Sequence, residues 1–65
     1  MLLNMKYNTN IKIGFGELKL MIDWCDTNCK EWGYSVIESA GRDAGTYQFF
    51  FDEERDYINF ILWKK

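Results

Sequence analysis

The sequence contains no histidine and no proline, and it has only two cysteines. Without histidine the chain cannot form a Ser–His or Cys–His pair, and it has no imidazole to act as a general base at neutral pH. A structural zinc site needs four ligands, which two thiols cannot supply within one chain, although two chains could share a four-cysteine site. We therefore expect a protein that is not an enzyme, with no catalytic residues, no cofactor and no metal.

Long apolar runs and an excess of basic charge are also missing. No stretch of about 18 apolar residues occurs, so we expect no contact with a membrane. The opening MLLNMKYN lacks the apolar core of a signal peptide, which predicts a cytoplasmic location, or the host cytoplasm if a phage encodes the chain. Eight Lys and Arg against ten Asp and Glu give a net charge of −2, which disfavours nucleic-acid binding because phosphates attract basic surfaces.

Large apolar side chains are what the sequence does contain. Apolar residues make up 48% and aromatic residues 18% of a chain of 65 residues. This composition predicts one small folded domain over residues 1–65. Domains of this size commonly depend on a disulfide, a metal or a partner subunit for stability. The aromatic content therefore directs attention to protein partners, including a second copy of the chain.

The stretch GELKLMIDWCDTNCKEWG (16–33) predicts the one helix, over about 17–32. Six apolar side chains recur at the i, i+3, i+4 spacing of a single helix face: Leu18, Met21, Ile22, Cys25, Cys29 and Trp32. Gly33 directly afterwards is typical of a helix end. Since both cysteines lie within the apolar stripe, we expect buried, reduced thiols.

Period-two alternation predicts strands around this helix. The predicted strands are NIKIGF (10–15), YSVIESA (34–40), TYQFFFD (46–52) and YINFILW (57–63), and a further strand over residues 2–7 is left open. The order β-α-β-β-β predicts an α+β fold, with one amphipathic helix packed on one face of a mostly antiparallel sheet of three or four strands. Five apolar side chains are expected beneath the helix: Phe49, Phe51, Ile58, Phe60 and Leu62.

This arrangement leaves apolar side chains without a place in the core. Phe50, Ile61 and Trp63 fall on the opposite face of the predicted sheet. Either the N-terminal residues cover them, or the sheet curls around them, or they contact a partner, because large exposed apolar patches mark partner sites. Leu20 lies opposite the buried helix stripe and Trp24 lies at its edge, as a local packing pair or as partner contacts.

The acidic stretch DEERD (52–56) is expected at an exposed hairpin tip. Its carboxylates either keep the tip soluble and discourage strand aggregation, or they contact a basic groove on a partner. Asp52, Glu53 and Glu54 therefore join the apolar residues above as predicted partner-binding residues.

We expect a non-enzymatic protein-binding domain that binds a host protein, self-associates as a homo-oligomer, or does both. In size, acidity and lack of proline the whole chain resembles small phage accessory proteins that bind and block a host machine, such as an RNA polymerase or a CRISPR effector. One alternative is a single-stranded nucleic-acid binder that stacks bases on Phe50, Tyr57 and Trp63. Another is a small structural protein of virion assembly.

Overall fold

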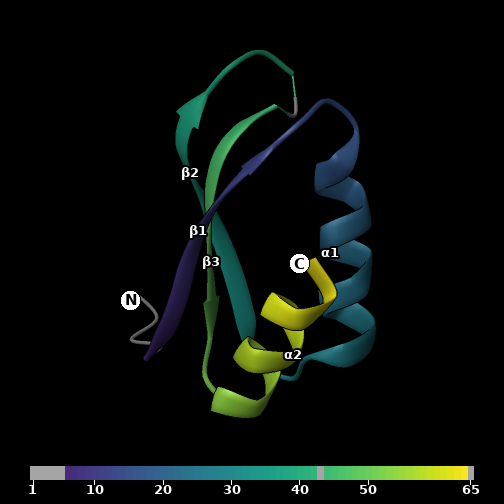
Figure 1. The fold of residues 1–65 in the computed structure, drawn as a ribbon, viewed down its shortest axis with the longest axis vertical. Coiled ribbons are helices and arrows are strands. Elements are labelled where there is room, and N and C mark those ends of the chain that lie inside the picture. Colours follow the sequence, from purple (N-terminus) through teal and green to yellow (C-terminus); the bar gives the residue numbers. More distant parts are fainter. Residues whose placement is uncertain (1–5, 43, 65) are drawn as a thin grey trace.

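The computed structural model describes residues 6–42 and 44–64, which form one antiparallel sheet with two helices on the same face (Figure 1). In chain order the elements are β1 (Tyr7–Ile13), α1 (Glu17–Asn28), β2 (Trp32–Ser39), β3 (Gly45–Phe51) and α2 (Glu54–Lys64). The predicted α+β class is confirmed. The first strand begins at Tyr7, and the possible strand over residues 2–7 falls largely on residues outside those described.

The sheet is built around β3, which lies between β1 and β2 and is antiparallel to both. Side chains alternate along a strand, so every second residue of β3 points toward the helices. Tyr47, Phe49 and Phe51 are these residues, and all three are buried. The placement of Phe49 and Phe51 beneath the helix layer follows the prediction from the sequence.

Helix α1 is shorter than predicted and ends at Asn28, not near residue 32. Cys29 adopts an extended conformation, and its N–H still donates to the carbonyl oxygen of Cys25 at 2.8 Å. The chain then turns, and Trp32 opens strand β2 instead of closing the helix. Trp32 remains an apolar contact of the core, because its ring stacks on Phe49 at 6.3 Å between ring centres.

The predicted last strand, residues 57–63, is wrong: this segment belongs to helix α2. A seven-residue apolar run does not distinguish a strand from a buried helix by its period alone. Central strand β3 already has a neighbour on each side, so the segment that follows it has no free edge of β3 to join. Acidic Glu54 and Asp56 in the first turn and Lys64 in the last turn suit a helix dipole.

This change reassigns the side chains of the segment. Phe60 is completely buried against β3, as predicted, but Ile58 and Leu62 are 45% and 60% exposed and do not lie in the core. Ile61 and Trp63 belong to the helix layer, so they do not share the opposite sheet face with Phe50.

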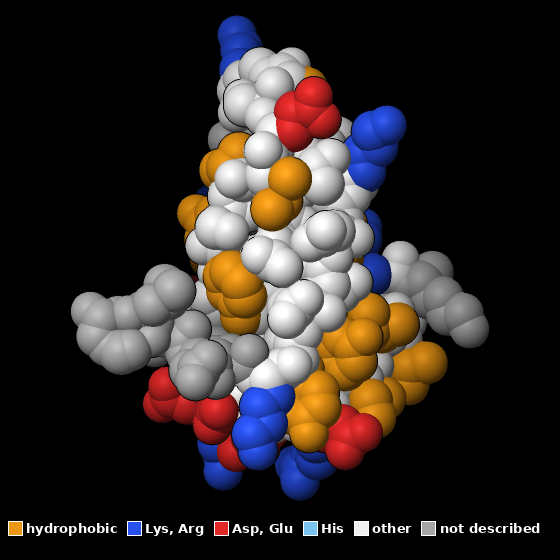
Figure 2. Space-filling model, turned by 90° about the vertical axis from the view of Figure 1, so that its left-hand side faces the viewer, with side chains coloured by type: hydrophobic (Ala, Val, Ile, Leu, Met, Phe, Trp, Pro, Cys, Tyr) orange, Lys and Arg blue, Asp and Glu red, His pale blue; other side chains and the backbone are white. Residues whose placement is uncertain are grey.

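The sheet face away from the helices is largely polar. Cross-strand pairs of β1 and β3 on this face join Asn10 to Gln48 and Asn8 to Phe50. The amide of Gln48 also donates to Asn8 Oδ1 at 3.2 Å. Figure 2 looks onto this face and shows much of it as white polar surface, with apolar side chains gathered mainly toward the lower right. A sheet with one covered and one polar face is ordinary for antiparallel strands.

Candidate protein-binding surface

Three of the predicted partner-binding residues, Leu20, Trp24 and Trp63, meet between the two helices. The indole rings of Trp24 and Trp63 stack with 4.9 Å between their centres and 13° between their planes. Leu20 lies one turn before Trp24 on α1, and its side chain is 63% exposed. Trp63 itself is 41% exposed. Residues some forty positions apart in the sequence therefore form one apolar surface.

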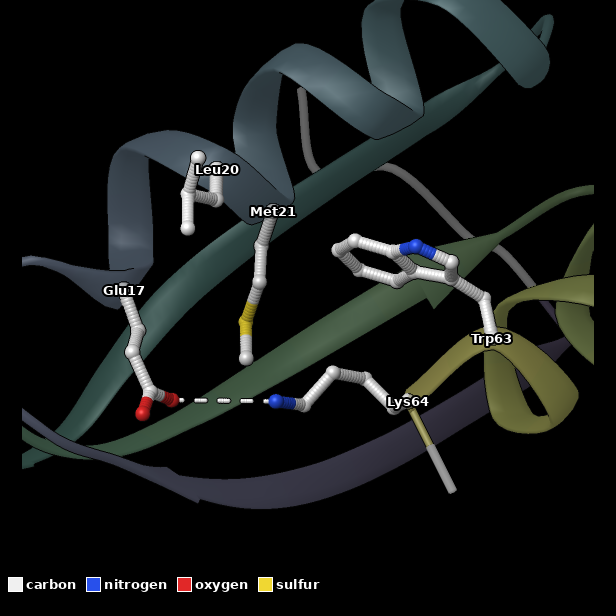
Figure 3. Close-up of a pocket in the computed structure, with 5 residues that line it drawn as sticks. All are labelled: Glu17, Leu20, Met21, Trp63 and Lys64. Carbon is white, nitrogen blue, oxygen red and sulfur yellow. Dashed lines mark ion pairs between the residues drawn. The ribbon is translucent and has the colours of Figure 1, made fainter.

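Leu20 and Trp63 border a groove of about 330 Å³, which we call the interhelical groove (Figure 3). Its lining consists of Glu17, Leu20, Met21, Trp63 and Lys64. The thioether of Met21 points toward the groove floor, and the Trp63 ring reaches across from α2 toward α1 (Figure 3). An apolar wall formed by Leu20 and Trp63, with the buried Met21 beneath it, suits the binding of an apolar side chain from a partner.

An ion pair closes one end of the interhelical groove. Lys64 Nζ lies 3.6 Å from Glu17 Oε1, and both side chains keep partial contact with solvent. Glu17 opens α1 and Lys64 ends α2, so each charge also favours its own helix dipole. The groove therefore offers one cation and one anion beside an apolar wall.

The other predicted apolar residues lie elsewhere. Ile61 lines a second, more open groove of about 480 Å³ between α2 and β1, together with Thr9, Asn10, Ile11, Lys12 and Lys64. Phe50 is half-buried on the polar sheet face. The predicted base-stacking platform of Phe50, Tyr57 and Trp63 is not formed, because Tyr57 stacks on Tyr7 and Trp63 stacks on Trp24.

The acidic residues mark the turn from β3 into α2. Asp52 and Glu54 are exposed and Glu53 is half-buried. The Asp52 N–H donates to the carbonyl oxygen of Glu31 at 3.1 Å, which ties this turn to the start of β2. The prediction of an exposed acidic turn thus holds, although the turn joins a strand to a helix and not two strands.

Asp56 is a structural residue that the sequence did not single out. It is 6% exposed, and its carboxylate accepts the backbone N–H of Lys30 at 3.1 Å. Through this bond α2 fixes the bend between α1 and β2. A helical assignment of residues 54–64 would have revealed the residue, since Asp56 and Phe60 then share one helix face.

The two thiols are free and sit at the end of α1. Cys25 is completely buried and Cys29 is partly buried. Burial raises the pKa of the Cys25 thiol far above its ordinary range, and the adjacent Cys29 raises it further. Burial and the nearby Asp56 raise the pKa of Cys29 to about 11. A protonated thiol is a poor nucleophile and a poor metal ligand, so these groups suit the core.

Among the described residues, no group of three or more His, Cys, Asp or Glu side chains could hold a metal ion. Neither α1 nor α2 is long and apolar enough to cross a bilayer. Comparison with family models, curated proteins and solved structures finds no match to this chain. The interhelical groove and its stacked tryptophans are therefore interpreted from their own chemistry.

Proposed function

We propose that the chain is a non-enzymatic protein-binding domain and that the interhelical groove is its contact surface. The observation that carries the proposal is the stacked pair of Trp24 and Trp63, which stands beside the exposed Leu20. Tryptophans held rigid by a neighbour lose little side-chain entropy on binding, and they are enriched among residues that dominate binding energy.

The size and acidity of the chain favour one form of this proposal, in which it is a phage-type accessory or inhibitor protein that occupies a site on a host protein. Exposed Asp52 and Glu54 add an acidic edge that suits a basic partner surface. In this form the tryptophan pair supplies affinity, while the acidic turn increases the rate of association.

Site-directed photocrosslinking in a bacterial lysate tests the proposal. A photoreactive amino acid at Leu20 is expected to give a discrete adduct with a partner protein. The same group at Lys19 is the matched control, because Lys19 is exposed on the same helix but does not line the groove. An equal yield of that adduct from both positions would exclude the groove as the contact surface.

A substitution then measures the strength of the contact. Leu20→Lys is expected to weaken binding of the crosslinked partner by about thirtyfold, which corresponds to about 2 kcal/mol. Lys19→Ala is expected to leave the affinity within about twofold. Isothermal titration calorimetry with the purified partner compares the two variants.

A further inference from the structure

The groove between α2 and β1 follows the outer edge of the sheet, and we call it the edge groove. Its volume is about 480 Å³, and it is lined by four consecutive residues of β1 and two of α2: Thr9, Asn10, Ile11, Lys12, Ile61 and Lys64. Side chains alternate along a strand, so Thr9 and Ile11 point to the helix side of the sheet, where they are half-buried. Asn10 and Lys12 point to the polar side and are exposed. A groove that is lined from both faces of an edge strand runs along the edge of that strand.

The backbone of β1 along this edge is available to another strand. Within the described residues, β1 has a single neighbour, β3. No turn, loop or cap hydrogen bond among the described residues uses a backbone group of β1. In an antiparallel pair every second residue turns its N–H and C=O away from the neighbouring strand. An extended peptide can bind this row of outward groups by adding a strand to the sheet.

The charge of the edge groove selects among extended peptides. Its charged lining residues are Lys12 and Lys64, and none of the described carboxylates lines it, in a chain whose net charge is −2. No described carboxylate pairs with Lys12, whereas Lys64 Nζ lies 3.6 Å from Glu17 Oε1. A lysine on an edge strand disfavours apolar and basic strands, so the same charge that discourages most pairing favours an acidic strand.

The alternation along β1 also determines where each kind of partner side chain falls. A residue that pairs with Ile11 points to the helix side, where Ile11 and Ile61 offer apolar contacts. The residue that pairs with Lys12 points to the polar side, where a carboxylate meets the Lys12 ammonium group. The edge groove therefore fits an extended segment in which apolar and acidic side chains alternate.

We propose that the edge groove binds an extended acidic segment of a partner protein, which becomes a fourth strand of the sheet beside β1. A second β1 strand does not supply this chemistry, because YNTNIKI (7–13) contains no acid. The edge groove shares only Lys64 with the interhelical groove. The proposal therefore stands or fails independently of the function proposed for the interhelical groove.

Nuclear magnetic resonance of the isotope-labelled full chain tests the site. The probe is a peptide of alternating valine and glutamate, and a peptide of alternating valine and lysine is its control. We expect saturable amide shifts at residues 9–12 with the acidic peptide and none with the basic peptide. The absence of such shifts at millimolar peptide, or equal shifts with both peptides or with a single-stranded oligonucleotide, would overturn the proposal. Shifts at residues 9–12 on dilution of the chain alone would assign the edge to a second copy and overturn it as well.

Charge reversal tests the role of Lys12. Lys12→Glu is expected to raise the Kd of the acidic peptide about tenfold, because it replaces an attraction with a repulsion. Lys19→Glu makes the same change in net charge on α1, away from the edge groove, and should leave the Kd within about twofold. Leu20→Ala should also leave it within about twofold, which separates this site from the interhelical groove. Equal losses in Lys12→Glu and Lys19→Glu would show that overall charge, and not the edge groove, attracts the peptide.

Methylation of the peptide nitrogens tests the backbone pairing. A strand that pairs with β1 directs only every second N–H toward it. Methylation of either the valine or the glutamate nitrogens is therefore expected to raise the Kd at least about tenfold, and methylation of the other set should leave it within about threefold. Equal losses for the two sets would show that the peptide binds without joining the sheet.

Discussion

The two edges of the sheet differ in how they are covered. Edge strand β1 carries Lys12 and lies against α2, and its Ile13 is buried. Edge strand β2 is almost entirely exposed, although its helix-side residues continue the same apolar layer. The difference arises because residues 54–64 form a helix that lies over β1 and β3 and leaves β2 uncovered. Among the described residues, α2 is the one element after β3, and it lies over the β1 side of the sheet.

The largest expected effect is on the unfolding free energy. It distinguishes the buried face of α2 from the exposed face of the same helix. Phe60→Ala removes a completely buried ring that packs at 5.0 Å from Phe49 and 5.1 Å from Phe51. We expect a loss of about 3–5 kcal/mol. That loss is comparable with the total stability of about 3–10 kcal/mol for a domain of this length. The variant should therefore be largely unfolded by circular dichroism.

Leu62→Ala is the matched control for this prediction. Leu62 is 60% exposed on the opposite side of α2, so its truncation should change the unfolding free energy by less than about 0.5 kcal/mol. In a strand, Phe60 and Leu62 would share one face and would lose similar stability. Equal effects in urea denaturation would therefore contradict the helical assignment of this segment.

This pair of residues also shows what the sequence could predict. The apolar stripe of α1 is readable because Leu18, Met21 and Cys25 repeat at the helical spacing over about two turns, a period that no strand shares. The run YINFILW is apolar at almost every position, so its period carried little information. Its placement depends on which strands already flank β3, and that is a tertiary constraint that no local pattern records.

The candidate surface was predictable in parts but not as a unit. The helical pattern identifies Leu20 and Trp24 because they lie outside or at the edge of the buried stripe, and strand alternation identifies Trp63 because it has no place in the predicted core. Their meeting depends on α2 crossing next to α1, which moves Trp63 from one side of the sheet to the other. The exposed apolar residues of β2 are not predicted from the sequence as a surface. The helical pattern includes Trp32, so the alternation of Trp32, Tyr34 and Val36 along one strand is not apparent.

The second prediction concerns the hairpin that joins the exposed edge strand β2 to β3. Gly45 has a φ of 141°, and a Cβ added there would lie 2.2 Å from the carbonyl oxygen of Glu38. We expect Gly45→Ala to cost about 2 kcal/mol or more, because the substitution combines backbone strain with a clash against β2. Amide hydrogen exchange should then become faster in β2 before it does in β1.

Gly41→Ala separates strain from clash in the same hairpin. Gly41 has a φ of 104°, but an added Cβ would meet no heavy atom within 4 Å. We expect a cost of about 1 kcal/mol from the backbone conformation alone. If thermal unfolding showed the same loss for both glycine variants, the close approach of Gly45 to Glu38 would have no energetic role.

The third prediction concerns the bond by which α2 holds the start of β2. Asp56→Ala removes the acceptor of the Lys30 N–H, and we expect a loss of about 1–2 kcal/mol in urea denaturation. Asp56→Asn keeps an oxygen at this position and should lose less than half as much. An asparagine variant as unstable as the alanine variant would show that the carboxylate charge, and not the hydrogen bond, stabilises this junction.

The smallest expected effect compares the two thiols, which lie one helical turn apart but differ in burial. The Cys29 pKa rises from 9.0 to about 11, so the unfolded chain releases this proton at a lower pH than the folded chain. The stability that protonated Cys29 contributes is therefore present below pH 9 and is lost as the pH rises from 9 to 11. We expect Cys29→Ala to reduce the alkaline decline in unfolding free energy measured across that range.

In the native protein, iodoacetamide should alkylate Cys29 slowly and Cys25 more slowly still, because only Cys25 is completely buried. Faster modification of Cys25 would mean that the C-terminal turn of α1 opens more readily than the core that it covers.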